Sequence, residues 1–269
     1  MTFASRFRSI LSEVGRLCVG IDPHGALLRE WGLPESAEGV RAFGLTTVDA
    51  VAGRAGIVKP QVAFFERYGS AGYAALEAVI SAARAAGLFV IADVKRGDIG
   101  STVDAYGDAW LAPGSPLEAD AMTAVAYQGL GSLDGVLGRA ADWGKGVIVV
   151  TATSNPEAVA TQTATRADGR TVAAGLVDGV RALPGTGGLV IGATVELADY
   201  GLTPASFGDV PILGPGFGAQ GAHLGDLARV FGPAASNVAV HLSRELLGAG
   251  PDGLPAAVER VQDELRGIG

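Results

Sequence analysis

Eight short apolar runs recur along the chain, and each ends in polar or glycine-rich residues. They lie at residues 17–22, 56–60, 88–95, 119–125, 146–153, 188–194, 210–215 and 237–243. The runs are apolar along most of their length rather than alternating, which is typical of strands buried on both faces of a parallel sheet. The pattern therefore predicts eight buried parallel strands.

Alanine-rich segments with helical periodicity lie between several of these runs, and a last one closes the chain. They are found at residues 36–52, 72–86, 130–141, 224–231 and 255–266. Strand and helix alternating eight times over about 250 residues is typical of a (β/α)8 or TIM barrel, an α/β fold. A doubly wound open sheet is the alternative. Because no clear linker interrupts the sequence, we expect one barrel domain over residues 1–269.

Composition and charge exclude several classes of protein. Hydrophobic residues make up 48% of the chain and charged residues 18%, so most of the chain should fold around a core. The net charge of -8 opposes binding to a nucleic-acid backbone. We find neither a signal-peptide core nor an apolar stretch near the roughly 20 residues of a membrane span. Cys18, the single cysteine, is expected to be a buried apolar residue, and it favours a cytoplasmic location.

Two loops carry features that suggest ligand contact. Residues 155–170 follow the fifth strand and form a polar, threonine-rich segment that could cover a ligand. Residues 214–221 follow the seventh strand and contain four glycines, which allow backbone amides to approach an anion closely. Barrels commonly bind phosphate at this place, although a plain tight connection would have a similar sequence.

A charged cluster follows the third strand, at residues 93–98. Side chains alternate across a strand, so Asp93 and Lys95 face the same side and should be neighbours. Asp98 comes after a glycine, where the chain leaves the strand, and its carboxylate could turn back to the site or reach a neighbouring subunit. Taken alone, this cluster could also be an ordinary solvated run of charges.

Charged residues also end the first two strands, at Asp22 and Lys59. Strand ends converge on one site only in a closed barrel, where they form a single rim. Alternating lysines and aspartates nearly cancel in charge, hold each ammonium against a carboxylate, and leave a carboxylate free to repel an incoming anion. Such an array can position and donate a proton.

Several motifs together resemble the orotidine 5'-phosphate decarboxylase family, in its longer, mycobacterial-type (type 2) branch. They are D-V-K-R-G-D-I-G-x-T, the earlier G-I-D-P-H and V-K-P, and G-P-G-F-G-A-Q-G followed by L-S-R. The resemblance extends from about residue 17 to about residue 246 and keeps the family's motif order. It implies a lyase that forms UMP from orotidine 5'-phosphate, the last step of de novo pyrimidine synthesis, without a metal or an organic cofactor.

The resemblance also implies roles for the charged residues. Lys95 matches the family's proton donor, whose ammonium stabilises the carbanion that develops at C6 and then protonates it. Asp93 matches the carboxylate beside the departing CO2, and Lys59 and Asp98 complete the network. In the family the last aspartate, with the residues matched by Ile99 and Thr102, enters the partner subunit's site. The resemblance therefore implies an obligate homodimer with shared active sites.

Five further residues match substrate contacts of the family. Asp22 matches a contact to the ribose hydroxyls, and Ser154 matches the serine that contacts the pyrimidine. Gln220, Arg244 and the backbone of Ser243 match the phosphate site. Ser243 stands where the shorter branch of the family often has glycine.

Other assignments remain open. A related barrel that shares the D-x-K-x-x-D element, such as 3-keto-L-gulonate 6-phosphate decarboxylase or hexulose-6-phosphate synthase, uses Mg2+ with sugar phosphates. A sugar-phosphate-binding barrel without turnover is the third reading, although a mere binder has no need for facing charges.

His24 and His241 near Asp22 could suggest a metal site, but no H-x-x-x-H or Cys/His spacing supports one, so we expect ligand-free histidines at the rim.

Overall fold

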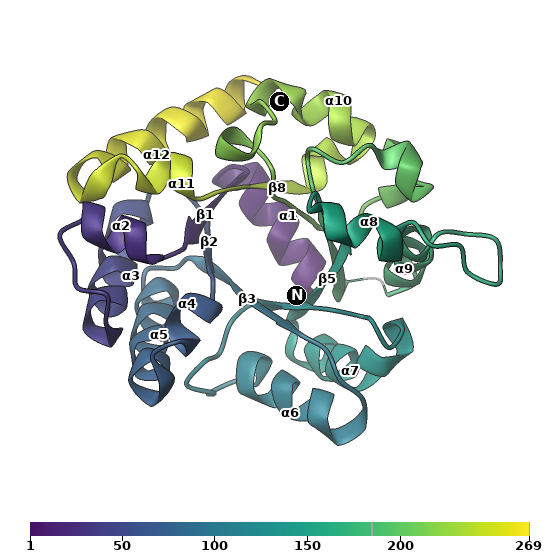
Figure 1. The fold of residues 1–269 in the computed structure, drawn as a ribbon, viewed down its shortest axis with the longest axis horizontal. Helices are drawn as coiled ribbons and strands as arrows, with labels where there is room; N and C mark the ends of the chain where they lie inside the picture. Colours follow the sequence, from purple (N-terminus) through teal and green to yellow (C-terminus); the bar gives the residue numbers. More distant parts are fainter. Residues whose placement is uncertain (184, 269) are drawn as a thin grey trace.

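The computed structural model describes residues 1–183 and 185–268 and shows a closed barrel of eight parallel strands (Figure 1). The strands neighbour one another in chain order, and β1 pairs with β8. They are β1 Leu17–Ile21, β2 Ile57–Pro60, β3 Phe89–Arg96, β4 Ala121–Ala124, β5 Gly146–Ala152, β6 Gly187–Ile191, β7 Ile212–Gly214 and β8 Val238–Leu242. The eight predicted strands and the (β/α)8 barrel are thus confirmed, and the open sheet is excluded.

Helices surround the barrel and complete most of its strand-to-strand connections (Figure 1). The α-helices are α1 Phe3–Glu13, α2 Gly25–Glu30, α3 Ala37–Val51, α4 Ala63–Glu66, α5 Gly69–Ala85, α6 Gly100–Leu111, α7 Asp134–Trp143, α8 Pro156–Gln162, α9 Val172–Arg181, α10 Leu227–Phe231, α11 Arg244–Leu247 and α12 Gly250–Gly267. Short 3-10 helices are η1 Leu130–Leu133, η2 Leu197–Tyr200, η3 Pro204–Phe207, η4 Gly218–Gln220, η5 Leu224–Asp226 and η6 Gly232–Asn237. Among the described residues, none of the helices combines the length and apolarity that crossing a membrane requires.

The five predicted helical segments are confirmed, but both predicted loops contain a short helix, α8 in residues 155–170 and the 3-10 helix η4 in residues 214–221. Residues 130–141 and 224–231 begin as 3-10 helices and continue as α7 and α10. Residues 155–170, expected to be a loop, contain α8. Pro156 occupies the first turn of α8, where its missing N–H costs no hydrogen bond and its fixed φ favours the helix. Because the segment is polar and rich in threonine, its sequence shows no apolar face that would predict this short helix.

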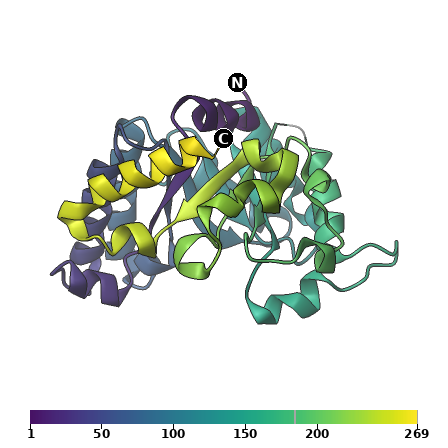
Figure 2. The same cartoon turned by 90° about the horizontal axis from the view of Figure 1, so that it is seen from above.

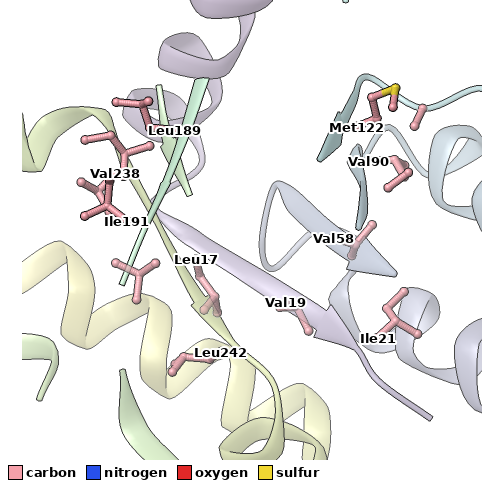
Figure 3. Packing of buried hydrophobic residues seen from close by; sticks show 14 of the residues in the cluster. Leu17, Val19, Ile21, Val58, Val90, Met122, Leu189, Ile191, Val238 and Leu242 are labelled. Carbon is pink, nitrogen blue, oxygen red and sulfur yellow. The ribbon is translucent and has the colours of Figure 1, made fainter. Parts of the chain in front are cut away.

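Both faces of the barrel strands are buried, and successive residues alternate between them. Leu17, Val19 and Ile21 of β1 belong to the large apolar cluster between the strands and the helices, part of which Figure 3 shows. Cys18 belongs instead to a second cluster that fills the barrel interior. This alternation explains why the strands read as continuous apolar runs.

Helix α1 covers the amino-terminal end of the barrel, as Figures 1 and 2 show from two directions. Its residues Phe3, Phe7 and Leu11 are buried and pack with the inward-facing residues of the strands. The ring centroids of Phe7 and Phe89 lie 6.0 Å apart. Because this end is filled with apolar side chains, any site inside the barrel must open at the opposite end.

The barrel interior changes from apolar to polar toward that opposite end. Two residues further along a strand, the side chain returns to the same face. The interior positions pass from Ile57 to Lys59 on β2, from Ile91 to Asp93 on β3, from Ala121 to Thr123 on β4 and from Ala239 to His241 on β8. The fold therefore gathers polar side chains from distant parts of the sequence above an apolar floor.

Candidate active site

The Asp93 carboxylate is the centre of this polar layer and accepts hydrogen bonds from four side chains. Lys59 Nζ lies 2.6 Å from Oδ2, and Lys95 Nζ lies 2.6 Å from Oδ1. Thr123 Oγ1 donates to Oδ1 at 2.9 Å, and Gln61 Nε2 donates to Oδ2 at 3.1 Å. Four donors fix the orientation of a carboxylate more firmly than any one of them could. Three of the four charged residues predicted to form one network are therefore together in the structure.

The charges of this cluster keep Asp93 and Lys59 ionised. Burial alone would raise the pKa of Asp93, but Lys59 and Lys95 outweigh it and hold that pKa well below its ordinary value. Burial alone would lower the pKa of Lys59, but the carboxylates of Asp93 and Asp22 raise it above its ordinary value. The cluster thus presents a permanent negative charge between two ammonium groups.

The two lysines differ in their access to solvent. The Lys59 side chain is 5% exposed, whereas that of Lys95 is 47% exposed. Lys95 also has a φ of 48°, in the left-handed region that a residue with a side chain rarely adopts. The pairing of β3 with β4 shifts register between Ala92 and Arg96, so this backbone irregularity lies within the strand. Lys95 is therefore the ammonium that a ligand can reach.

The residues after Lys95 explain why the motif continues with arginine and glycine. The Arg96 guanidinium forms an ion pair with Glu66 and lies over the ring of Tyr106, 5.7 Å from its centroid. Gly97 passes so close to β4 that a Cβ atom would lie 2.2 Å from the carbonyl oxygen of Val125. Only glycine fits there without a backbone shift, and this close passage sets the direction of the loop that follows.

Asp98 lies outside the cluster of its own chain. Its Oδ1 accepts a hydrogen bond from the backbone N–H of Ile99 at 2.8 Å. In residues 1–183 and 185–268, no ion pair joins Asp98 to a lysine. Ile99 is 60% exposed, and Thr102 is exposed as well. The fourth charged residue of the predicted network is therefore not paired with the lysines in the described part of the same chain.

A cavity next to the cluster brings together four of the predicted substrate-binding residues. Asp22, Gln220, Ser243 and Arg244 line it, together with Phe217, Ala219, His241, Leu242 and Glu245. Asp22 Oδ1, Ser243 Oγ and His241 Nε2 are buried there without hydrogen-bond partners in the described structure. Unpaired polar atoms are costly to bury, so three of them in one cavity indicate a place built for polar ligand atoms.

The glycines of the loop after β7 meet specific steric demands. Gly216, Gly218 and Gly221 have φ values of 111°, 64° and 112°. A Cβ atom on Gly218 would also lie 1.7 Å from a carboxylate oxygen of Glu245. These positions place the loop beside Arg244, where the sequence predicted an anion site.

Ser154, a predicted substrate-binding residue, lies outside the cavity that holds four of the others. It lies just beyond β5, is exposed, and is not among the residues that line the cavity. The neighbouring Thr153 donates its backbone N–H to Gln162 Oε1 at 2.9 Å, which ties α8 to the end of β5. A contact between Ser154 and a pyrimidine stays a prediction.

Sequence reasoning missed two residues of this region, Gln61 and Thr123. Each occupies an inward position of its strand or just beyond it, so the two-residue alternation that pairs Asp93 with Lys95 could have found them. His241, expected at the rim, is the second-last residue of β8, where it lines the cavity and lies among the charged groups. Burial, with a smaller contribution from Lys59, lowers the pKa of His241 to about 3, so its ring is neutral.

The remaining candidates of the sequence have structural roles. His24 accepts the backbone N–H of Leu27 through Nδ1 and begins α2, and His223 begins η5. Cys18 is buried in the barrel interior, as predicted, and burial raises its pKa to about 12. Over the described residues, no group of three or more His, Cys, Asp or Glu side chains has a geometry suited to a metal ion.

A family model, curated relatives and solved structures all place this chain in the same family. Residues 15–258 match the orotidine 5'-phosphate decarboxylase / HUMPS family. The orotidine 5'-phosphate decarboxylase of Salinispora tropica is 47% identical over 274 residues, which cover 98% of this chain and 97% of the relative. A crystal structure from Streptomyces avermitilis superimposes with a TM-score of 0.94 at 43% identity, covering 99% of this chain and 95% of the other. The Leishmania donovani OMP decarboxylase has a TM-score of 0.81 at 28% identity, covering 100% of this chain and 99% of that one.

Proposed function

The chain belongs to the orotidine 5'-phosphate decarboxylase / HUMPS family, and on that basis we propose that it converts orotidine 5'-phosphate to UMP and CO2. The observation that carries this proposal is the Asp93 carboxylate held between Lys59 and the accessible Lys95. The bond between C6 and the carboxylate carbon breaks, and its electron pair stays on C6. CO2 leaves, and Lys95 then delivers a proton to C6.

Placed charge supplies the catalysis in this reaction. A carbanion at C6 has little resonance stabilisation, so a preorganised ammonium close to it is the dominant favourable interaction. Lys95 provides that ammonium, and its contact with Asp93 at 2.6 Å aims it into the barrel mouth. The fixed charge of Asp93 faces the substrate carboxylate, and the repulsion between them ends when CO2 departs.

The phosphate and ribose of the substrate occupy the neighbouring cavity. Arg244 binds phosphate oxygens through its planar guanidinium, and Gln220 and the backbone of Ser243 complete this site. Asp22, whose Oδ1 lacks a partner, accepts a hydrogen bond from a ribose hydroxyl. Ser154 approaches the pyrimidine from the end of β5. Binding energy from the phosphate, remote from C6, serves to hold the reacting groups in place.

A second copy of the chain completes the site. Asp98, Ile99 and Thr102 enter the partner's barrel mouth, where Asp98 becomes the second carboxylate beside Lys95. Two observations support this homodimer: Lys95 is open on one side, and the large apolar side chains of Ile99 and Tyr127 are 60% and 82% exposed. Exposed apolar groups of this size are typical of surfaces that associate.

The reaction needs no metal or organic cofactor, because lysines and aspartates supply the charge. The alternative is a Mg2+-dependent sugar-phosphate decarboxylase or aldolase of the same superfamily. We place the enzyme in the cytoplasm, where its single cysteine stays reduced. A small-molecule nucleotide is the partner that this site accepts, not nucleic acid, since the chain carries a net charge of -8.

The direct test follows the ultraviolet absorbance of orotidine 5'-phosphate with purified protein in excess EDTA. We expect fast turnover by the wild type and a loss on the order of 10³-fold or more in Lys95→Ala, which removes the proton donor. The variant should remain a folded dimer, checked by circular dichroism and light scattering. A folded wild type that is inactive in EDTA but converts sugar phosphates with Mg2+ would establish the alternative instead.

A further inference from the structure

We propose that Thr123 is a positioning residue that sets the relative placement of the two groups that act on the substrate, the Lys95 ammonium and the Asp93 carboxylate. This proposal rests on the proposed function and adds to it a residue that carries no charge. Thr123 lies on β4, is almost completely buried, and faces the barrel interior above Ala121.

The Thr123 hydroxyl joins the backbone of one of these residues to the side chain of the other. Its oxygen accepts the backbone N–H of Lys95 at 2.9 Å, and its proton goes to Asp93 Oδ1 at 2.9 Å. The direction of both bonds is fixed, because a backbone N–H can only donate and an ionised carboxylate can only accept. A single hydroxyl thus accepts a hydrogen bond from the backbone of Lys95 and donates one to the carboxylate of Asp93.

The backbone at Lys95 needs such a partner. Among residues 1–183 and 185–268, Lys95 is the one non-glycine residue with a positive φ. Such a conformation is unfavourable for a residue with a side chain and persists only where the surroundings hold it in place. Register between β3 and β4 runs from the Ala92–Met122 pair to the Arg96–Ala124 pair, so Lys95 lies in the irregular part between them. There the Thr123 hydroxyl, and not a backbone carbonyl of the regular strand pairing, accepts the Lys95 N–H.

The left-handed turn at Lys95 matters for the direction of its side chain. It lets the ammonium return to Asp93, two residues earlier on the same strand, at 2.6 Å while its side chain stays 47% exposed to the barrel mouth. Without the Thr123 hydroxyl, the Lys95 N–H would be unpaired and Asp93 would lose one of its four donors. Both groups would then move relative to the substrate, and a misplacement of about 1 Å can cost on the order of 100-fold in rate.

The test compares Thr123→Val, which keeps the shape but removes the hydroxyl, with Thr123→Ser, which keeps the hydroxyl. Thr47→Val is the matched control: Thr47 is a buried threonine of α3 whose Oγ1 donates to the Phe43 carbonyl at 2.8 Å, and it does not line the cavity. For each protein we would measure kcat and KM for orotidine 5'-phosphate, the affinity for UMP, and the melting temperature.

We expect Thr123→Val to lose roughly 10- to 100-fold in kcat, while KM and the UMP affinity change by less than about threefold, because the phosphate and ribose contacts are untouched. Thr123→Ser should recover kcat to within about fivefold of the wild type. Thr47→Val should keep the wild-type kcat even if its melting temperature falls as much as that of Thr123→Val. Should Thr123→Val fail to fold, Thr123→Ala removes the same hydroxyl and replaces it in the comparison.

Two results would overturn the positioning role. One is a Thr123→Val enzyme, or its alanine substitute, with wild-type kcat. The other is a Thr123→Ser enzyme as slow as Thr123→Val, which would assign the effect to packing instead of the hydroxyl. A folded wild type that does not decarboxylate orotidine 5'-phosphate would overturn the proposed function, and this inference with it.

Discussion

Lys59 and Asp93 form an ion pair of 2.6 Å inside the barrel, and their side chains are only 5% and 8% exposed. Removing one partner of such a pair leaves an uncompensated buried charge, at a cost of about 3–5 kcal/mol. The same carboxylate contacts Lys95, which is half-exposed. The buried ion pair therefore holds the more accessible ammonium of the cluster, that of Lys95, in a fixed position.

Arg244→Ala should raise KM by roughly 10- to 100-fold and change kcat much less, because a charge-assisted contact to phosphate contributes about 1.5–3 kcal/mol. Inhibition by inorganic phosphate should weaken in parallel. Arg229→Ala is the matched control, since Arg229 is exposed and pairs with Asp226 outside the cavity. Unchanged phosphate inhibition in Arg244→Ala would show that the phosphate lies elsewhere.

Mixed dimers test the shared site. Lys95→Ala and Asp98→Ala should each be nearly inactive alone, but a mixture should regain activity. One of the two sites in a hybrid dimer then receives both Lys95 and the Asp98 of the other chain. Random exchange makes about half of the dimers hybrids, so about a quarter of the wild-type activity is expected. Subunit exchange is checked with differently tagged chains; exchange without recovery would contradict a site shared between subunits.

Gly97→Ala should slow the enzyme although glycine has no side chain that could act on the substrate. Its new Cβ would lie 2.2 Å from the Val125 carbonyl oxygen, so the loop that carries Asp98 must shift. We expect kcat to fall by roughly 10-fold or more. Gly138→Ala, in α7 with open space around its Cβ position, is the control and should keep full activity. Equal kcat in both variants would mean that the loop tolerates the shift.

His241 should make the protein less stable in mild acid. Its pKa is about 3 in the folded protein and 6.5 in the unfolded chain, so the unfolded state binds more protons below about pH 6.5. Stability from this group is fully present above that pH and falls as the pH drops toward 3. By about pH 5 the loss reaches about 2 kcal/mol of unfolding free energy.

Denaturant unfolding at about pH 7.5 and about pH 5 checks this expectation. His241→Asn should remove most of the difference between the two pH values, whereas His223→Asn, at an exposed helix start, should leave it unchanged. If the wild type and His241→Asn lost the same free energy between the two pH values, the neutral buried state of His241 would be wrong.

The sequence predicts the barrel well because its strands are buried on both faces and therefore read as continuous apolar runs. Helices α6 and α8 are harder to recognise from pattern, since α6 follows directly on a charged strand end and α8 is short and polar. Helix α1 was also missed, although Phe3, Phe7 and Leu11 repeat every four residues on one face. Its role depends on the open barrel end, which exists only once the fold is known.

The candidate site likewise contains residues that the sequence predicts and residues that it does not. Alternation along β3 correctly placed Asp93 beside Lys95, and the closed rim brought Lys59 to them. Thr123 was overlooked because a neutral residue inside an apolar strand carries no signal until its partners are known. Among the described residues, Asp98 forms no ion pair with a lysine of its own chain, and its proposed role depends on a second copy of the protein.

The closure of the barrel by α1 also decides where the ends of the chain lie. Helix α12 ends beside α1, where Arg266 Nη2 donates to the Val14 carbonyl at 3.2 Å (Figure 2). Figure 2 shows that the start of α1 and the end of α12 lie on the same side of the barrel, opposite the mouth that holds Lys95. An affinity tag, a fluorescent label or a surface attachment at either end would leave the substrate entrance free.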